Sequence, residues 1–122
     1  MPITLTGPVI HGKALARTFA IPTANIEPAE NIDGLDFGVY ASEVLVEGRT
    51  YLGVSNLGMR PTVADGDRVN LETFILDYHD DLYGKQIAVT LIQFMRPEKK
   101  FDSIDQLMEQ IHKDIALRTG IS

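Results

Sequence analysis

The chain has 122 residues, of which 44% are hydrophobic and 23% are charged. This length and composition are those of an ordinary globular protein, and they predict a single domain over residues 1–122. The net charge of −6 argues against the basic surface of a nucleic-acid-binding protein, although a nucleotide substrate needs only a local site. The absence of cysteine excludes disulfides, thiolate zinc sites and thiol nucleophiles.

No stretch approaches the run of about 20 apolar residues that a membrane-spanning helix requires. The N-terminus lacks the charged and apolar regions of a signal peptide. We therefore expect a cytoplasmic, monomeric protein without a membrane or nucleic-acid partner. The histidines are scattered, and we expect surface positions rather than a shared metal site for His11, His79 and His112.

Short segments rich in β-branched and aromatic residues follow one another with turn signals between them. The segments predicted as strands are the start of Met1–Ile10, then Phe19–Ile26, Phe37–Val46, Thr50–Leu57, Val69–Tyr78 and Gln86–Met95. The turns and loops predicted between them are Pro28–Phe37, Glu47–Arg49, Met59–Arg68 and His79–Lys85. Alternation along the fifth of these strands places Glu72 and Phe74 on one face and Leu71, Thr73 and Ile75 on the other.

The pattern changes near the C-terminus. Ser103 is a typical N-cap residue, and Gln106 stands at the third helical position, as in a capping box. Apolar residues then follow with helical spacing until Gly120, where we expect the helix to stop. Consecutive strands joined by hairpins predict an antiparallel sheet, and about six of them in so short a chain favour closure into a small barrel. The helix would cover an open side or end of this barrel.

The stretch Ile21–Asn25 carries the first chemical signal. In an extended chain Thr23 and Asn25 point the same way, because side chains alternate with a period of two. Two neutral oxygen donors on one face suit Mg²⁺, which keeps several waters and takes further ligands from substrate phosphates. The alternative is structural, because threonine is a good strand former and the asparagine would then belong only to a turn. Upstream, Gly12 and Arg17 flank a loop that could wrap polyphosphate.

Further motifs follow in a fixed order along nearly the whole chain. They are Gly7-x-Val9-x-x-Gly12, Arg17, Pro22-Thr23-Ala24-Asn25, Gly38-Val39-Tyr40-Ala41, Asn56-Leu57-Gly58-x-Arg60-Pro61-Thr62, Glu72-Thr73-Phe74-Ile75, Asp81-Leu82-Tyr83-Gly84 and Arg96-Pro97-Glu98-Lys99-x-Phe101-x-Ser103. This ordered set resembles the signature of the ATP-dependent riboflavin kinase (flavokinase) family. The resemblance implies a mainly β fold, a small closed antiparallel six-stranded Greek-key barrel with one C-terminal α-helix.

The resemblance also implies an activity. The family transfers the γ-phosphoryl group of ATP to the 5′-hydroxyl of riboflavin, giving FMN and ADP. Glu72 matches the catalytic glutamate and would act as general base, whereas its structural alternative is a solvated strand carboxylate. Thr23 and Asn25 would hold Mg²⁺ and the terminal phosphates of ATP.

Other positions match residues that contact the two substrates. The resemblance assigns ATP binding to Gly12, Arg17, Thr23, Asn25, Ile75, Asp77 and Tyr83, and flavin binding to Arg96, Lys99 and Phe101. Glycine lets backbone amides approach phosphate, and arginine offers a fork of donors. Structural alternatives remain open: Arg17 as a surface cation, Ile75 as a core residue, Tyr83 as a packing residue and Phe101 as a hydrophobic staple before the helix.

The sequence departs from the family pattern where Ala16 and Ala20 replace two glycines. A β-carbon at a position that needs a positive φ costs on the order of 1 kcal/mol. A degenerate member that binds flavin or nucleotide without catalysis is therefore an alternative, although Thr23, Asn25 and Glu72 are all retained. A third hypothesis, a protein interaction module, has no specific support. Many bacterial relatives carry an adenylyltransferase domain that makes FAD, so we expect such a domain or enzyme as a partner.

Overall fold

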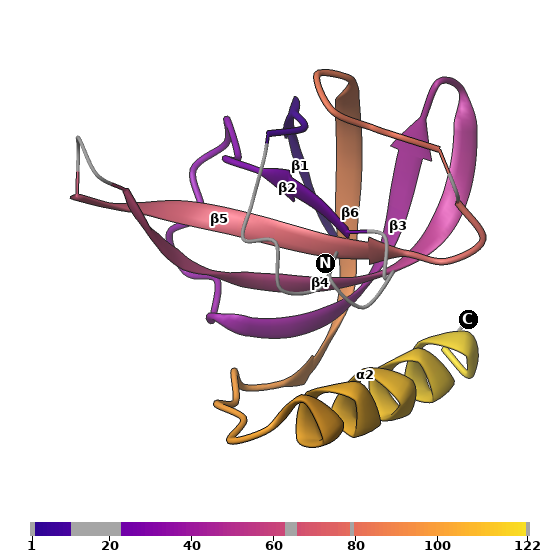
Figure 1. The fold of residues 1–122 in the computed structure, drawn as a ribbon. Helices are drawn as coiled ribbons and strands as arrows, with labels where there is room; N and C mark the ends of the chain where they lie inside the picture. Colours follow the sequence, from indigo (N-terminus) through magenta and orange to yellow (C-terminus); the bar gives the residue numbers. More distant parts are fainter. Residues whose placement is uncertain (1, 11–22, 63–65, 79, 122) are drawn as a thin grey trace.

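The computed structural model describes residues 2–10, 23–62, 66–78 and 80–121. Figure 1 shows a strongly curled sheet with one helix beside it. The elements are β1 (Ile3–Pro8), β2 (Thr23–Ile26), β3 (Gly38–Val46), β4 (Arg49–Thr62), β5 (Gly66–Ile75), β6 (Gln86–Arg96) and α2 (Ile104–Thr119). The predicted mainly β fold with a C-terminal helix is confirmed. None of the helical segments in the described ranges is long and apolar enough to cross a membrane.

The strands form one six-stranded sheet in the order β1-β6-β3-β4-β5-β2, and every neighbouring pair is antiparallel. The turn predicted between β3 and β4 is confirmed. Glu47 and Gly48 adopt positive φ values of 49° and 81° there. Such left-handed geometry at both turn positions matches the natural twist of a tight hairpin.

The long loop predicted for Met59–Arg68 is wrong, because β4 and β5 both extend into it. Pro61 lies inside this extension, paired with Asp67. Proline donates no hydrogen bond to a sheet and is confined to edges. Beyond Leu57 strand β4 pairs with β5 alone, since the β3 partner of Leu57 is Gly38, the first residue of β3. The proline that indicates a loop in the sequence is therefore tolerated in a strand with an open side.

The edge strands β1 and β2 are joined by contacts at their flanks. The backbone N–H of Ile10 donates to the carbonyl of Asn25 at 2.8 Å, and that of Ala29 donates to the carbonyl of Thr6 at 3.0 Å. The carboxylate of Glu30 accepts from the backbone N–H of Thr6 at 2.7 Å and from its hydroxyl at 2.5 Å. The Thr6 hydroxyl lowers the pKa of Glu30 by more than desolvation raises it. These contacts bring the sheet edges together in a barrel-like curl.

The inner face of the curled sheet holds the apolar core. Its most buried members include Leu5, Ile26, Val44, Leu57, Leu71 and Val89. Three buried hydroxyls cross the same face, because Ser55 Oγ lies 2.8 Å from both Ser42 Oγ and Thr73 Oγ1. These buried polar groups satisfy one another. Because side chains alternate along a strand, the neighbours of these residues in β3, β4 and β5 project to the outer face of the sheet, where α2 packs.

Helix α2 packs against β4 on the outer face of the sheet (Figure 1). The predicted N-cap is confirmed, because Ser103 Oγ accepts from the backbone N–H of Gln106 at 3.2 Å. The side chain of Gln106 accepts in turn from the N–H of Asp102 at 3.1 Å, one residue before the N-cap. Near the other end, Arg118 is 1% exposed and donates from Nε to carbonyls of β3 and β4 at 3.0 and 3.1 Å. Both ends of the helix are thus fixed.

Candidate active site

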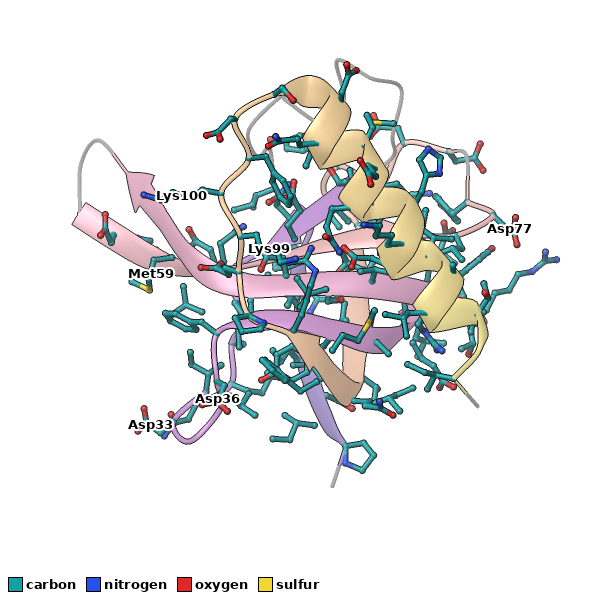
Figure 2. The ribbon with its side chains drawn as sticks, turned by 90° about the horizontal axis from the view of Figure 1, so that it is seen from below. Asp33, Asp36, Met59, Asp77, Lys99 and Lys100 are labelled. Carbon is teal, nitrogen blue, oxygen red and sulfur yellow. The ribbon has the colours of Figure 1, made fainter. Side chains whose placement is uncertain are left out.

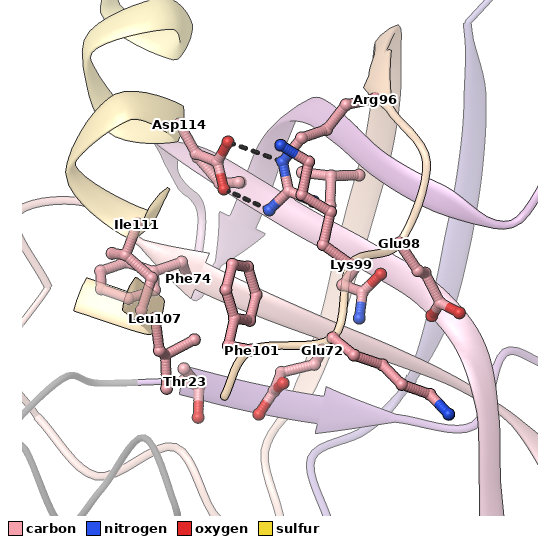
Figure 3. A pocket seen from close by; sticks show the side chains of 14 residues that line it. Thr23, Glu72, Phe74, Arg96, Glu98, Lys99, Phe101, Leu107, Ile111 and Asp114 are labelled. Atoms are coloured by element: carbon pink, nitrogen blue, oxygen red, sulfur yellow. Dashed lines mark hydrogen bonds and ion pairs between the residues drawn. The ribbon is translucent and has the colours of Figure 1, made fainter. Parts of the chain in front are cut away.

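A pocket of about 570 Å³ lies between the outer face of the sheet, the segment that follows β6, and helix α2 (Figure 3). Pockets that bind small molecules typically measure roughly 300–1,000 Å³. The sheet contributes Thr23, Asn56, Glu72 and Phe74, among others, to its lining. The helix contributes the apolar side chains of Leu107 and Ile111. One side of the pocket is therefore rich in oxygen atoms and the other is apolar.

The register of the strands sets the polar side chains in rows. Asn25 of β2 pairs with Glu72 of β5, which pairs on its other side with Asn56 of β4. Residues paired in this way project to the same face. Thr23 pairs with Phe74 in the adjacent row. Thr23 and Asn25 thus share one face, as their alternation predicts, and Glu72 lies on that face with them.

The oxygen donors of this face fit a hard cation. Asn25 is 5% exposed, and its Oδ1 accepts from Asn70 Nδ2 at 3.0 Å. A carbonyl oxygen has two lone pairs, so this atom keeps one for a cation. Thr23 adds a hydroxyl and Glu72 a carboxylate, and oxygen ligands are those that Mg²⁺ prefers. Across the described ranges, no cluster of three or more His, Asp or Glu side chains forms a metal site.

An ion pair joins the sheet to the helix at the opposite wall of the pocket. Arg96 donates from Nε to Asp114 Oδ1 at 3.0 Å and from Nη2 to Oδ2 at 2.7 Å (Figure 3). Gln110 donates to the same Oδ1 at 2.9 Å. The side chains of Arg96 and Asp114 are 18% and 6% exposed. Arg96, predicted to contact flavin, lines the pocket with its guanidinium held by α2.

The other two residues predicted to contact flavin, Lys99 and Phe101, also line the pocket. Lys99 Nζ donates to Gln110 Oε1 of the helix at 3.3 Å. The half-buried ring of Phe101 shares the pocket with Leu107, in the first turns of α2 (Figure 3). In this position Phe101 can both pack before the helix, as a hydrophobic staple does, and contact a ring bound in the pocket.

The residues predicted to bind ATP fall into separate regions. Thr23 lines the pocket, and the buried Asn25 lies on the same face of the sheet outside the pocket lining. Gly12 and Arg17 lie outside the described residues, as do Ala16 and Ala20. Ile75 is 2% exposed and belongs to the core, its structural alternative. Among the histidines, His112 is exposed as predicted, while His11 and His79 are outside the described residues.

Asp77 and Tyr83 lie away from the pocket lining. Asp77 is exposed with φ 61°, a left-handed conformation that ends β5 earlier than predicted. Figure 2 shows Asp77 at the right-hand edge of the molecule and Lys99 near the middle of the view. Tyr83 is 56% exposed. Its neighbour Gly84 donates to the carbonyl of Val9 at 2.9 Å, so this segment runs beside the end of the first described range.

Three polar residues of the pocket have no role that their local sequence indicates. Asn56 and Glu98 stand inside the motifs quoted above, but the residue types alone indicate only exposed polar positions. Asp114 follows Gln110 by one helical turn, and two polar residues at this spacing indicate a helix face exposed to solvent. The structure instead places all three in the pocket lining. A buried carboxylate in a helix becomes visible only when its arginine partner, distant in sequence, is placed beside it.

The arrangement has a definite chemical capacity. A carboxylate beside neutral oxygen ligands can accept a proton from a hydroxyl while a bound cation offsets phosphate charge. The apolar wall of Phe101, Leu107 and Ile111 suits a flat aromatic ring. The pocket therefore fits a substrate that joins a ring to a hydroxyl near the oxygen-rich side.

Comparison with known proteins agrees with this chemistry. The Flavokinase family model, described as riboflavin kinase, matches residues 1–120. Over 114 residues the chain is 46% identical to the bifunctional riboflavin kinase/FMN adenylyltransferase of Escherichia coli (strain K12), covering 93% of this chain and 36% of that protein. Over 112 residues it is 40% identical to the RNA-binding riboflavin kinase RibR of Bacillus subtilis (strain 168), covering 92% and 48%. The chain thus spans half or less of the length of these relatives.

Solved structures share the fold. A macrolide-efflux protein from Streptococcus pneumoniae aligns with a TM-score of 0.89 at 31% identity, covering 99% of this chain and 40% of that one. Riboflavin kinase from Trypanosoma brucei aligns with a TM-score of 0.70 at 22% identity, covering 98% and 78%. The family model spans almost the entire sequence, and the pocket residues fall within it. On this evidence the chain belongs to the flavokinase family of riboflavin kinases.

Proposed function

We propose that this chain transfers the γ-phosphoryl group of ATP to the 5′-hydroxyl of riboflavin and releases FMN and ADP. The observation that carries the proposal is the cross-strand row of Asn25, Glu72 and Asn56 beside an apolar pocket wall. Membership of the flavokinase family supports the same reaction. Phosphoryl transfer depends mainly on positioning and on charge stabilisation, which such a row can supply.

Glu72 is the proposed general base. Its place on the pocket face, between two amide residues, lets the carboxylate receive the proton of the ribityl 5′-hydroxyl as the oxygen attacks the γ-phosphorus. Thr73 and Ile75 belong to the same strand and are buried on its opposite face, where their packing holds the backbone of β5 in place. The carboxylate therefore sits on a rigid element, which suits a reaction that depends on alignment.

Thr23 and Asn25 are the proposed Mg²⁺ ligands and contacts for the terminal phosphates of ATP. The hydrogen bond from Asn70 fixes the orientation of the Asn25 amide, a role that supporting residues commonly play around metal ligands. When bound, the ion would neutralise part of the charge on the phosphates. Gly12 and Arg17 are proposed to wrap the polyphosphate, and Asp77 and Tyr83 to contact the nucleotide, whereas the buried side chain of Ile75 belongs to the core.

The flavin ring is proposed to lie against Phe101, Leu107 and Ile111. Lys99 stands at the rim, where its cation can meet the carbonyl oxygens of the ring. Arg96 lines the pocket and contributes mainly by fixing α2 through Asp114. FMN, the product, is the substrate of the FMN adenylyltransferase named in the bifunctional relatives, so such an activity is the proposed partner.

The test compares Glu72→Gln with Glu43→Gln. Glu43 is an exposed carboxylate on β3 outside the pocket, so it controls for loss of one negative charge on a strand. General base assistance is worth roughly 10²- to 10⁴-fold in typical enzymes, and we expect a loss of kcat in that range for Glu72→Gln alone. Riboflavin affinity, measured by quenching of its fluorescence, should stay close to that of the unmodified protein. Equal turnover by the two folded variants would remove Glu72 from the mechanism.

A further inference from the structure

Glu98 makes a contact with strand β4 that the proposed reaction does not explain. The Asn56 side-chain amide is oriented so that both its oxygen and its nitrogen are satisfied. In this orientation Asn56 Nδ2 donates to Glu98 Oε1 at 3.2 Å and to the carbonyl of Gly38 at 3.3 Å. Glu98 belongs to the segment between β6 and α2, outside the sheet. The carboxylate therefore reaches from this segment onto the sheet.

Gly58 gives independent support for the same contact. The three heavy atoms nearest to a Cβ built on Gly58 all belong to the Glu98 side chain, and Oε1 would overlap that Cβ. Gly58 is not among the glycines with positive φ, so its backbone conformation is open to any residue. The space that a glycine leaves here is thus filled by the carboxylate. Asn56 and Gly58, two residues apart on one face of β4, together form a seat for Glu98.

The other contacts of the segment between β6 and α2 join it to the end of β6 and to the helix. Pro97 accepts from Arg96 Nη1 at 3.0 Å, which holds the segment to the end of β6. Lys99 reaches Gln110 at 3.3 Å, and Asp102 reaches the helix one turn earlier at 3.1 Å. Among the hydrogen bonds of the described residues, the bond from Asn56 is the one that holds this segment to β4. This bond ties the segment to the sheet, whereas the bonds of Lys99 and Asp102 tie it to the helix.

We propose that Glu98 is a positioning residue that seats on Asn56 and Gly58 and so holds the segment of Lys99 and Phe101 as the riboflavin-binding wall of the pocket. The inference rests on the proposed riboflavin kinase activity. Asn56 pairs with Glu72 across the strands, so the seat lies directly beside the proposed base. The seat thereby fixes the distance between the flavin wall and the reacting end of the pocket.

Two substitutions disturb the contact from opposite sides. Glu98→Ala removes the carboxylate, and Gly58→Ala displaces it with a methyl group, which a flexible side chain can accommodate without unfolding. We expect each to raise the KM for riboflavin about tenfold, equivalent to about 1.4 kcal/mol, with kcat and the KM for ATP changed less than about twofold. Glu98→Gln keeps an acceptor for Asn56 and should restore most of the affinity. Glu109→Ala, which removes an exposed helix carboxylate paired with Lys113, is the matched control.

The decisive comparison is the double variant. If Gly58 is required only because Glu98 fills its space, Gly58→Ala has no further effect in the Glu98→Ala background. Full additivity of the two effects would overturn the proposal, as would unchanged riboflavin affinity in Glu98→Ala. Amide hydrogen exchange of residues 98–102, measured without substrate, should quicken in both single variants and stay unchanged in Glu109→Ala. This readout separates failure of the seat from failure of the kinase assignment, because it needs no ligand, and unchanged exchange would also overturn the proposal.

Discussion

The ion pair between Arg96 and Asp114 is predicted to carry a large part of the attachment of α2. The perturbation is Asp114→Asn, which keeps the volume of the side chain but removes its charge and turns an amide donor toward the guanidinium. The pair is bidentate at 3.0 and 2.7 Å, and the Asp114 side chain is only 6% exposed. The hydrogen bond that Gln110 donates to Asp114 Oδ1 is weakened at the same time, because its acceptor is no longer charged. The variant therefore leaves a largely buried cation without its counterion.

The magnitude follows from the degree of burial. Removing one partner of a fully buried pair costs about 3–5 kcal/mol. The Arg96 side chain is 18% exposed and keeps a bond to the Pro97 carbonyl, so some of this cost is recovered from water. We expect a loss of about 2–3 kcal/mol in the free energy of unfolding, because partial exposure lowers the full penalty. With a slope of about 2 kcal/mol per M urea, the unfolding midpoint would fall by about 1 M or slightly more.

The assay is equilibrium urea unfolding followed by circular dichroism, with Arg96→Met and the double variant completing a cycle. The cycle should give a coupling free energy of at least about 1.5 kcal/mol, since each partner is satisfied mainly by the other. Glu109→Gln, which disrupts the exposed pair with Lys113, should cost less than about 0.5 kcal/mol. A loss below about 0.5 kcal/mol in Asp114→Asn, with weakened riboflavin binding, would refute the anchoring role and favour direct contact between Arg96 and flavin.

Three further predictions concern other parts of the molecule. The pKa of Glu30 is lowered by Thr6, so its contribution to stability is present above the ordinary value of 4.5 and is lost as pH falls through the folded pKa; the stability difference from Glu30→Gln should shrink below pH 4.5 in urea titrations. Ser103→Ala removes the cap on Gln106 and should lower the free energy of unfolding by about 1 kcal/mol in the same assay. Thr23→Val keeps a β-branched strand residue but removes a proposed ligand, and should raise the Mg²⁺ concentration for half-maximal FMN formation several-fold, on the order of 1 kcal/mol.

Local sequence signals predicted the elements whose cause is local. The turn at Glu47 and Gly48, the cap at Ser103 and the alternation around Glu72 each depend on neighbouring residues, and each is confirmed. The loop signal at Pro61 was misleading, because its tolerance depends on where β3 ends. That position is a property of the sheet and cannot be read from the residues around the proline.

The same division holds in the pocket. The shared face of Thr23 and Asn25 follows from a period of two within one strand, so the sequence predicts it. The pairing of Arg96 with Asp114 and of Glu98 with Asn56 joins segments distant in the chain, and nothing in either local sequence marks the partner. Such contacts decide which charged residues remain available to a ligand. The resemblance to the family indicated which residues belong to the site. The residues that orient them could be identified only from the fold, which brings distant segments together.

The most direct test of the central proposal incubates the purified chain with riboflavin, ATP and Mg²⁺ and separates the products by chromatography. The account predicts that FMN and ADP accumulate in equal amounts, that chelation of Mg²⁺ stops their formation, and that riboflavin is unchanged when ATP is omitted. A folded protein that forms no FMN under these conditions would contradict the account. If that protein still quenched riboflavin fluorescence, the pocket would be a flavin-binding site without phosphoryl transfer.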